Sequence, residues 1–89
     1  MLTVFYMNGC PYCSMARKAV DELQRENSAF AGVQLKWIEE RTNAALAAQY
    51  DYYYVPSVFD GTKKLYEADP SQDYESVKAS MRQALAAAC

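Results

Sequence analysis

Two cysteines, Cys10 and Cys13, lie three positions apart near the start of the chain, and Pro11 directly follows the first. They come after a short apolar run typical of a strand and before a pattern typical of a helix. If the helix begins at Pro11, Cys10 lies at its N-terminus, where unpaired N–H groups and the helix dipole favour a thiolate over a thiol. Cys10 is therefore predicted to be the nucleophile of a dithiol redox site, and Cys13 its resolving thiol.

Other interpretations of Cys10 and Cys13 stay open from the residues alone. The pair could be two buried structural thiols, or half of a metal site shared between two chains. A [2Fe–2S] cluster bound by two chains through Cys10 and external thiols is a further alternative. The chain has no histidine, and its third cysteine, Cys89, ends the sequence. We expect no metal site within the chain, no tightly bound cofactor, and no catalytic role for Cys89.

Length and composition fit one small globular domain spanning residues 1–89, with room for a single core. The net charge is −2 and no run of Lys or Arg occurs, so neither a nucleic acid nor an anionic membrane is an expected partner. The first residues do not resemble a signal peptide, and we therefore expect a cytoplasmic location. We also expect a monomer. In that reducing compartment a Cys-x-x-Cys pair is more often catalytic or metal-binding than structural.

The elements around the cysteines predict a strand–helix–strand unit. Residues 3–7 are β-branched or aromatic and end at an Asn-Gly pair, which indicates a buried strand. Residues 11–26 place apolar side chains at helical spacing, with charged side chains between them. Residues 33–38 alternate apolar and polar positions and form a second predicted strand. A connection of this length favours a right-handed crossover and parallel pairing, which places the cysteines at the carboxyl end of the first strand.

The second half of the chain predicts a helix and then a hairpin. A cap at Thr42 or Asn43 precedes the strong helix formers of residues 44–48. Four tyrosines follow between residues 50 and 54, and we expect some to pack in the core and others to reach the surface. Two short strands then flank the dipeptide Asp-Gly at 60–61, which supplies the positive φ values of a tight hairpin turn.

The last element is a predicted helix with an apolar stripe running from Tyr74 to Ala88. Asp69 is expected to cap it and Pro70 to occupy its first position. The element order is then β-α-β, α, β-β, α. The fold class predicted from this order is α/β, with a four-stranded mixed sheet flanked by three helices.

Two motifs in this framework resemble those of the glutaredoxins, within the thioredoxin superfamily. They are CPYC at residues 10–13, after a strand, and VPSVF at residues 55–59, before the Asp-Gly hairpin. The resemblance covers essentially the whole chain. It implies a thioredoxin-like fold and a dithiol–disulfide oxidoreductase that reduces protein disulfides or glutathione mixed disulfides in cell redox homeostasis. It also implies a cis peptide bond at Pro56, substrate pairing with the backbone of Val55, and a groove wall formed by Tyr12.

The same resemblance implies a glutathione site formed by Pro11, Tyr12, Val55, Pro56 and Asp69, with Asp69 receiving the α-amino group. The chain departs from the family pattern at two places. Met7 stands where a Lys or Arg is usual, and Tyr66-Glu67 stand where a Gly-Gly pair is usual. Glu67 adds bulk and negative charge where an anionic tripeptide would lie. Two electron donors therefore stay open: glutathione as a co-substrate, and thioredoxin reductase, which a related group of small redoxins uses.

Overall fold

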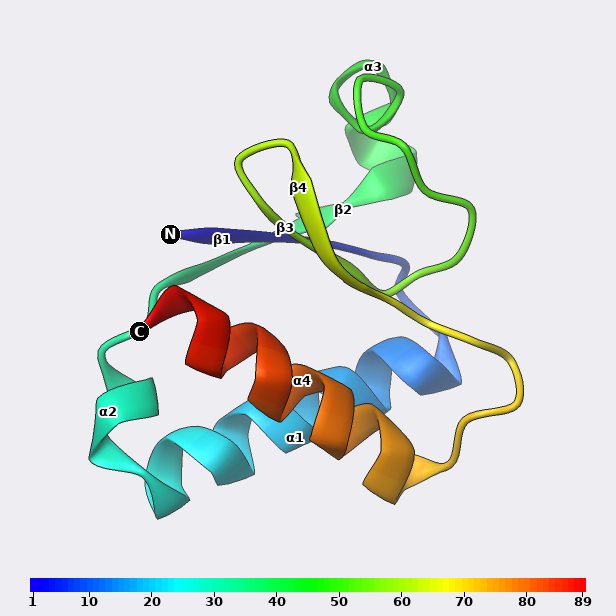
Figure 1. Cartoon of the computed structure of the whole chain (residues 1–89). Helices are drawn as coiled ribbons and strands as arrows, with labels where there is room; N and C mark the ends of the chain where they lie inside the picture. Colours follow the sequence, from blue (N-terminus) through cyan, green and yellow to red (C-terminus); the bar gives the residue numbers. More distant parts are fainter.

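A four-stranded mixed sheet lies at the centre of the molecule, and the computed structural model describes all 89 residues (Figure 1). The strand order is β2-β1-β3-β4; β1 runs parallel to β2 and antiparallel to β3, and β3 and β4 form a hairpin. This confirms the predicted α/β class and the parallel pairing. In chain order the elements are β1 (Leu2–Tyr6), α1 (Pro11–Glu26), α2 (Ser28–Ala31), β2 (Leu35–Glu39), the 3-10 helix η1 (Glu40–Thr42), α3 (Ala44–Ala47), β3 (Ser57–Asp60), β4 (Lys63–Glu67) and α4 (Tyr74–Ala88).

The larger part of the core lies between the sheet and the two long helices, α1 and α4, which pack side by side on one face (Figure 1). Each helix turns one apolar stripe toward the sheet, as its sequence spacing predicts. This cluster holds fourteen buried residues, and its largest fully buried side chains include Leu2, Leu23, Met81 and Leu85. The cluster holds α1, and with it the two cysteines, in a fixed position relative to β1.

The opposite face of the sheet has a smaller core of three buried side chains, Phe5, Ile38 and Phe59. The predicted helix over residues 44–48 is a single short helix, α3, so it covers little of this face. Tyrosine rings cover the rest: the centroid of Tyr50 lies 4.7 Å from that of Phe5, and Tyr52 stacks on Phe5 at 5.2 Å. The expectation that some of these tyrosines pack in the core and others reach the surface is confirmed, because Tyr50 and Tyr52 pack on Phe5 whereas Tyr53 is 91% exposed.

The β3–β4 hairpin turns one residue later than the sequence predicts. Asp60 pairs with Lys63, so the two central residues of the turn are Gly61 and Thr62. Gly61 has φ +60°, whereas no residue other than glycine in the chain has a positive φ. This pattern fits a type II′ turn, in which glycine takes the first central position. The prediction that Asp60 and Gly61 together supply the positive φ values was therefore wrong for Asp60.

The start of α4 also differs from the prediction. Asp73 is the N-cap, and its Oδ1 accepts a hydrogen bond from the backbone N–H of Ser76 at 2.9 Å. Asp69 instead closes a separate turn, where its Oδ1 accepts bonds from the backbone N–H and the hydroxyl of Ser71 at 2.9 and 2.8 Å. The predictions that Asp69 caps this helix and that Pro70 opens it were wrong, because a second capping aspartate follows closely along the chain.

Candidate active site

A tight turn connects β1 to α1 and carries the first cysteine. The backbone N–H of Cys10 donates to the carbonyl of Met7 at 3.3 Å, and Gly9 within the turn has φ +85°. A side chain at this φ would be strained, so glycine is the residue that lets the chain reverse here. Cys10 then takes an extended conformation as the N-cap of α1, and Pro11 occupies the first helical position. The predicted strand-to-helix corner is confirmed.

The sulfur of Cys10 lies between two backbone groups. It accepts the backbone N–H of Cys13 at 3.3 Å, which satisfies one of the unpaired donors at the start of α1. It also lies 3.7 Å from the carbonyl oxygen of Val55, to which a thiol can donate. The N–H contact stabilises negative charge on Cys10, as the helix dipole does. Cys10 is half-buried and therefore accessible to a second sulfur.

Cys13 is in a different environment, because it faces the core and is only 5% exposed. Burial, together with a hydrogen bond to Cys10, raises the pKa of the Cys13 thiol from its ordinary 9.0 to about 12. Cys13 therefore keeps its proton near neutral pH. The two sulfurs lie next to each other with unequal access to solvent, which is the arrangement that a nucleophile and a resolving thiol require.

The segment before β3 forms the other wall of the site. The Val55–Pro56 peptide bond is cis, as the family resemblance implies. Pro56 is buried, and its carbonyl accepts the N–H of Ala68 from the segment that follows β4. The carbonyl of Val55 is directed at Cys10. The dithiol and the cis-proline segment, which lie far apart in the sequence, therefore meet at one edge of the sheet.

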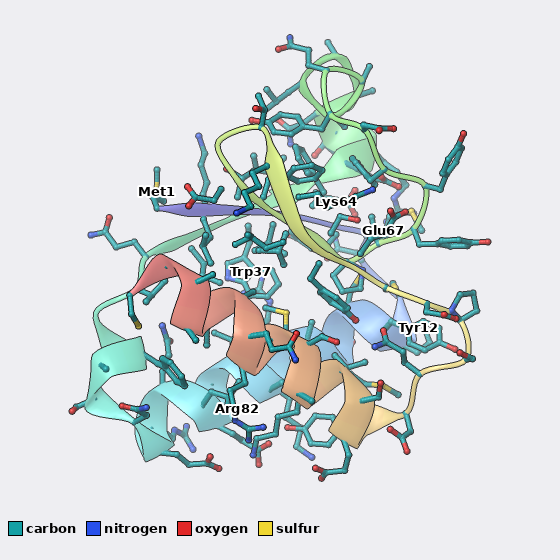
Figure 2. All side chains as sticks on the ribbon, viewed as in Figure 1. Met1, Tyr12, Trp37, Lys64, Glu67 and Arg82 are labelled. Carbon is teal, nitrogen blue, oxygen red and sulfur yellow. The ribbon has the colours of Figure 1, made fainter.

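Two further residues of the predicted site, Tyr12 and Asp69, lie toward the loop between β4 and α4. The hydroxyl of Tyr12 donates to the carbonyl of Pro70, and Figure 2 shows Tyr12 beside this loop. Asp69 lines an open pocket of about 480 Å³. The remaining lining residues are Tyr53, Tyr54, Glu67, Ala68 and Pro70. Hydrogen bonds from the backbone and hydroxyl of Ser71 lower the pKa of Asp69, so its carboxylate stays charged.

Glu67 has a structural role that the sequence does not reveal. Its Oε2 accepts the backbone N–H groups of Tyr53 and Tyr54 at 2.7 and 2.8 Å, and its Oε1 pairs with the ammonium of Lys64 at 2.7 Å. Burial raises the pKa of Glu67, but hydrogen bonds from Lys64, Tyr54 and Tyr53 outweigh it and leave the pKa below its usual value. A charged carboxylate therefore holds the loop that leads into the cis-proline segment.

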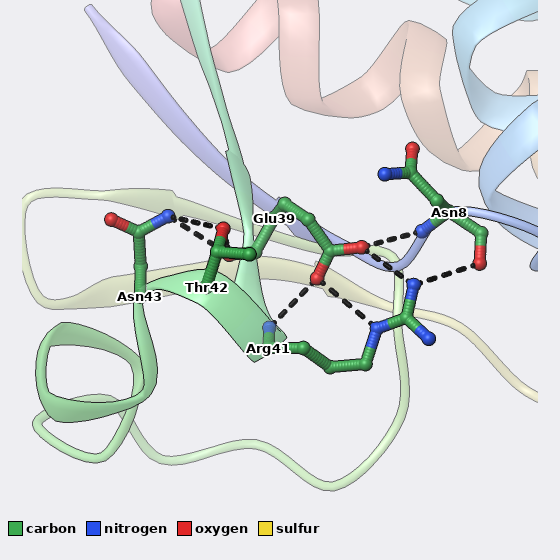
Figure 3. Close-up of polar contacts among 5 residues, drawn as sticks. All are labelled: Asn8, Glu39, Arg41, Thr42 and Asn43. Carbon is green, nitrogen blue, oxygen red and sulfur yellow. Dashed lines mark hydrogen bonds and ion pairs between the residues drawn. The ribbon is translucent and has the colours of Figure 1, made fainter.

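A second group that sequence reasoning missed lies where β2 ends beside β1. The side chain of Glu39 is 9% exposed and accepts bonds from the backbone N–H of Asn8 at 2.7 Å and from the guanidinium Nη2 of Arg41 at 2.9 Å (Figure 3). Hydrogen bonds from the Arg41 side chain, then from the backbone of Asn8 and Arg41, lower the pKa of Glu39 to about 2. The sequence did hold a signal for this contact. Glu39 ends a strand predicted to run parallel to β1, and the carboxyl ends of neighbouring parallel strands lie at the same edge of a sheet.

No protein-family model and no curated protein sequence matches the chain, whereas solved structures do. One is a malarial protein, with a TM-score of 0.60, 18% identity and 92% of each chain covered. Another is a point mutant of thioredoxin from Halobacterium salinarum NRC-1, with a TM-score of 0.57, 25% identity, and 91% of this chain and 70% of that chain covered. A third holds the first two thioredoxin domains of Saccharomyces cerevisiae Eps1p, with a TM-score of 0.59, 17% identity, and 94% of this chain and 35% of that chain covered.

The chain has the thioredoxin fold. The thioredoxin neighbour at 25% identity supports a place in the thioredoxin superfamily and, at that level, a redox-type oxidoreductase. The guanidinium of Arg17, on α1, lies 4.3 Å from the ring centroid of Trp37. The chain contains no group of three or more His, Cys, Asp or Glu side chains arranged to bind a metal ion. None of its helices has the length and apolar character needed to cross a membrane.

Proposed function

We propose that the chain is a glutaredoxin-like dithiol–disulfide oxidoreductase that reduces protein disulfides or glutathione mixed disulfides. One observation carries this proposal: the sulfur of Cys10 accepts the backbone N–H of Cys13 at 3.3 Å and lies 3.7 Å from the carbonyl of Val55, just before a cis proline. An extended substrate that pairs with the backbone at Val55 would bring its disulfide to Cys10. The proposal places this reaction in the cytoplasm and in a monomer.

The first step is attack by the Cys10 thiolate on one sulfur of the substrate disulfide. A new S–S bond joins Cys10 to the substrate as the original S–S bond breaks. The second substrate sulfur leaves with the electron pair and takes a proton from water. The N–H group of Cys13 and the start of α1 favour the thiolate that this step consumes.

The second step is release of the substrate by Cys13. Cys13 loses its proton and its sulfur attacks Cys10, which breaks the mixed disulfide and expels the other substrate sulfur, to be protonated in turn. The substrate has then gained two electrons and two protons, and the chain holds a Cys10–Cys13 disulfide. A donor dithiol, or two molecules of glutathione, returns these electrons and protons to the chain.

Thioredoxin reductase is the second candidate donor, and the contacts of Glu67 favour it over glutathione. The Glu67 carboxylate lines the pocket beside the site and already occupies the N–H groups of Tyr53 and Tyr54. Glutathione carries two carboxylates, and the ammonium of Lys64 is already paired with Glu67 at 2.7 Å, so it is not free to bind them. Met7, in place of a basic residue, offers no compensating cation. The proposed partners are therefore disulfide-bearing proteins or glutathione mixed disulfides as substrates, with thioredoxin reductase favoured over glutathione as the electron source.

Coupled assays can separate these donors. NADPH consumption is measured with a protein disulfide substrate, either with glutathione and glutathione reductase or with thioredoxin reductase. Wild type, Cys10→Ser, Cys13→Ser and the control Cys89→Ser are compared. We expect turnover that Cys10→Ser abolishes and that Cys89→Ser leaves unchanged. Activity lost in Cys13→Ser indicates the dithiol route, and glutathione-linked activity retained in Cys13→Ser indicates a monothiol route. No turnover with either donor would refute the proposed function.

A further inference from the structure

Asn8 lies in the turn that delivers Cys10, and both of its backbone polar groups are bound by side chains from one distant segment. Its N–H donates to Glu39 Oε2 at 2.7 Å, and its carbonyl accepts from Arg41 Nη2 at 3.1 Å (Figure 3). The same Arg41 nitrogen bonds the same Glu39 oxygen at 2.9 Å. The backbone of Asn8, the carboxylate of Glu39 and the guanidinium of Arg41 are therefore each hydrogen-bonded to the other two.

The turn has few other restraints. Asn8 and Gly9 are both exposed, and the one backbone bond across the turn, from Cys10 N–H to the Met7 carbonyl, is 3.3 Å long. Gly9 has greater backbone freedom than any other residue type. Without its side-chain contacts the turn could therefore change its dihedral angles at little cost. Such a change would move Cys10 relative to the Cys13 N–H and the Val55 carbonyl.

Glu39 and Arg41 can restrain this turn because they are themselves fixed. Glu39 is the last residue of β2 and is paired in register with Tyr6, the last residue of β1. Its Oε1 also accepts the backbone N–H of Arg41 at 2.7 Å, so the carboxylate is bound on both oxygens. Charged hydrogen bonds to a mostly buried group are stronger than bonds between neutral groups. The end of β2 thus supplies a rigid support for the turn.

We propose that Glu39 and Arg41 are positioning residues of the redox site: by binding both backbone groups of Asn8 they hold the 7–10 turn in the conformation that keeps the Cys10 sulfur on the Cys13 N–H. Neither side chain touches the reacting sulfurs. Their effect passes through the turn to the thiolate form of Cys10 and therefore to its rate of attack. This inference deepens the redox role proposed above, but its test does not depend on any assumed substrate or donor.

The test measures how fast iodoacetamide alkylates Cys10 in the reduced full-length protein, with the modified site identified by peptide mass spectrometry. Arg41→Met and Glu39→Gln are compared with wild type across neutral and alkaline pH. Arg25→Met is the matched control, since it removes a comparable 3.0 Å ion pair, with Asp21, at the other end of α1. Arg41 is 58% exposed, so Arg41→Met should fold, and circular dichroism checks this for each variant.

We expect the alkylation rate of Cys10 at pH 7 to fall at least about threefold in Arg41→Met and Glu39→Gln, with no change in Arg25→Met. At alkaline pH, where the thiolate forms without assistance, the rates should converge. A purely structural role would lower thermal stability and leave this pH profile unchanged. Folded variants that alkylate like wild type at every pH would overturn the positioning role. If wild type shows no disulfide reduction but the variants alkylate more slowly, the proposed function fails and the positioning role stands.

Discussion

Cys13 determines how the second half of the proposed reaction depends on pH. Its pKa of about 12 has burial as its largest cause, and this cause does not depend on the thiol of Cys10. Below that pKa the thiolate fraction rises tenfold for each pH unit. We therefore expect the rate of substrate release from the mixed disulfide to rise steadily from about pH 7 to about pH 9, without a plateau.

Stopped-flow measurement of product thiol release, starting from a preformed mixed disulfide at Cys10, checks this dependence. Cys13→Ser provides the control, because it can form the mixed disulfide but cannot release its substrate through an internal disulfide. A release rate that levels off near neutral pH would contradict the high pKa of Cys13.

In the proposed function, Glu67 is the residue expected to affect the choice of electron donor most directly. Glu67→Gln keeps the size of the side chain and one oxygen acceptor for the N–H groups of Tyr53 and Tyr54, but it removes the charge. We expect glutathione-linked turnover to rise several-fold because the two carboxylates of glutathione are no longer repelled. Turnover through thioredoxin reductase should not rise in parallel. Asp60→Asn, which removes one negative charge at the exposed hairpin turn, is the control, and an equal rise there would indicate only a net-charge effect.

At the scale of elements, Glu39 at the end of β2 makes the stability of the fold depend on pH. Its pKa in the folded chain is about 2, lowered from an ordinary 4.5 mainly by the Arg41 side chain. A lowered pKa stabilises the folded state above about pH 4.5, and this contribution disappears as the pH falls to about 2. The urea midpoint of wild type should therefore exceed that of Glu39→Gln at pH 7, and the two midpoints should converge near pH 2. A gap that persists at pH 2 would show that the variant loses stability for a reason other than charge.

The layer between the sheet and the helices α1 and α4 holds the larger apolar cluster. Met81 has no exposed surface and lies in the larger cluster with Val4 and Leu23. Met81→Ala is expected to lower the free energy of unfolding by about 2 to 5 kcal/mol, because it removes buried methylene groups and leaves a cavity. Arg82→Ala on the exposed side of the same helix should change it by no more than about 0.5 kcal/mol. Urea denaturation followed by circular dichroism measures both values, and equal losses would contradict the assigned burial.

At the scale of the whole molecule, sequence patterns predicted the features that depend on neighbouring residues. The corner at Cys10 follows from local signals, namely a strand, an Asn-Gly turn and a proline at the helix start. The start of α4 was misplaced because Asp69 and Asp73 both satisfy the local rule for a cap, and only the packing of the loop chooses between them. The contact of Glu39 with Asn8 joins residues thirty-one positions apart, which no local pattern reveals.

The cis bond before Pro56 came from family resemblance rather than from residue chemistry. A proline at the start of a strand is compatible with either isomer. The shortness of α3 was missed for a different reason. The alanines at 44–48 have high helix propensity, but the tyrosines that follow pack on Phe5 and Phe59, and this tertiary contact ends the helix early.

The two faces of the sheet are unequal, and this has a consequence for motion near the site. Fourteen buried residues lie on the side of α1 and α4, but only three lie under residues 44–55. The amides of Ala47, Ala48 and Tyr50 bond only to carbonyls within residues 43–47. Few buried contacts and local hydrogen bonds allow a segment to open without global unfolding. Residues 44–50 should therefore be the least protected ordered part of the chain, and they lie shortly before the cis-proline segment in the sequence.

Native-state hydrogen exchange at increasing urea tests this expectation. Exchange at Ala47, Ala48 and Tyr50 should proceed by local opening, with a free energy that barely changes as urea is added. Val4, whose strand lies between β2 and β3, should exchange only through global unfolding and follow the full urea dependence. Equal protection and equal urea dependence at both places would mean that the tyrosine-covered face unfolds together with the larger core. Any motion of the backbone at Val55 would then need a cause other than local opening of the segment before it.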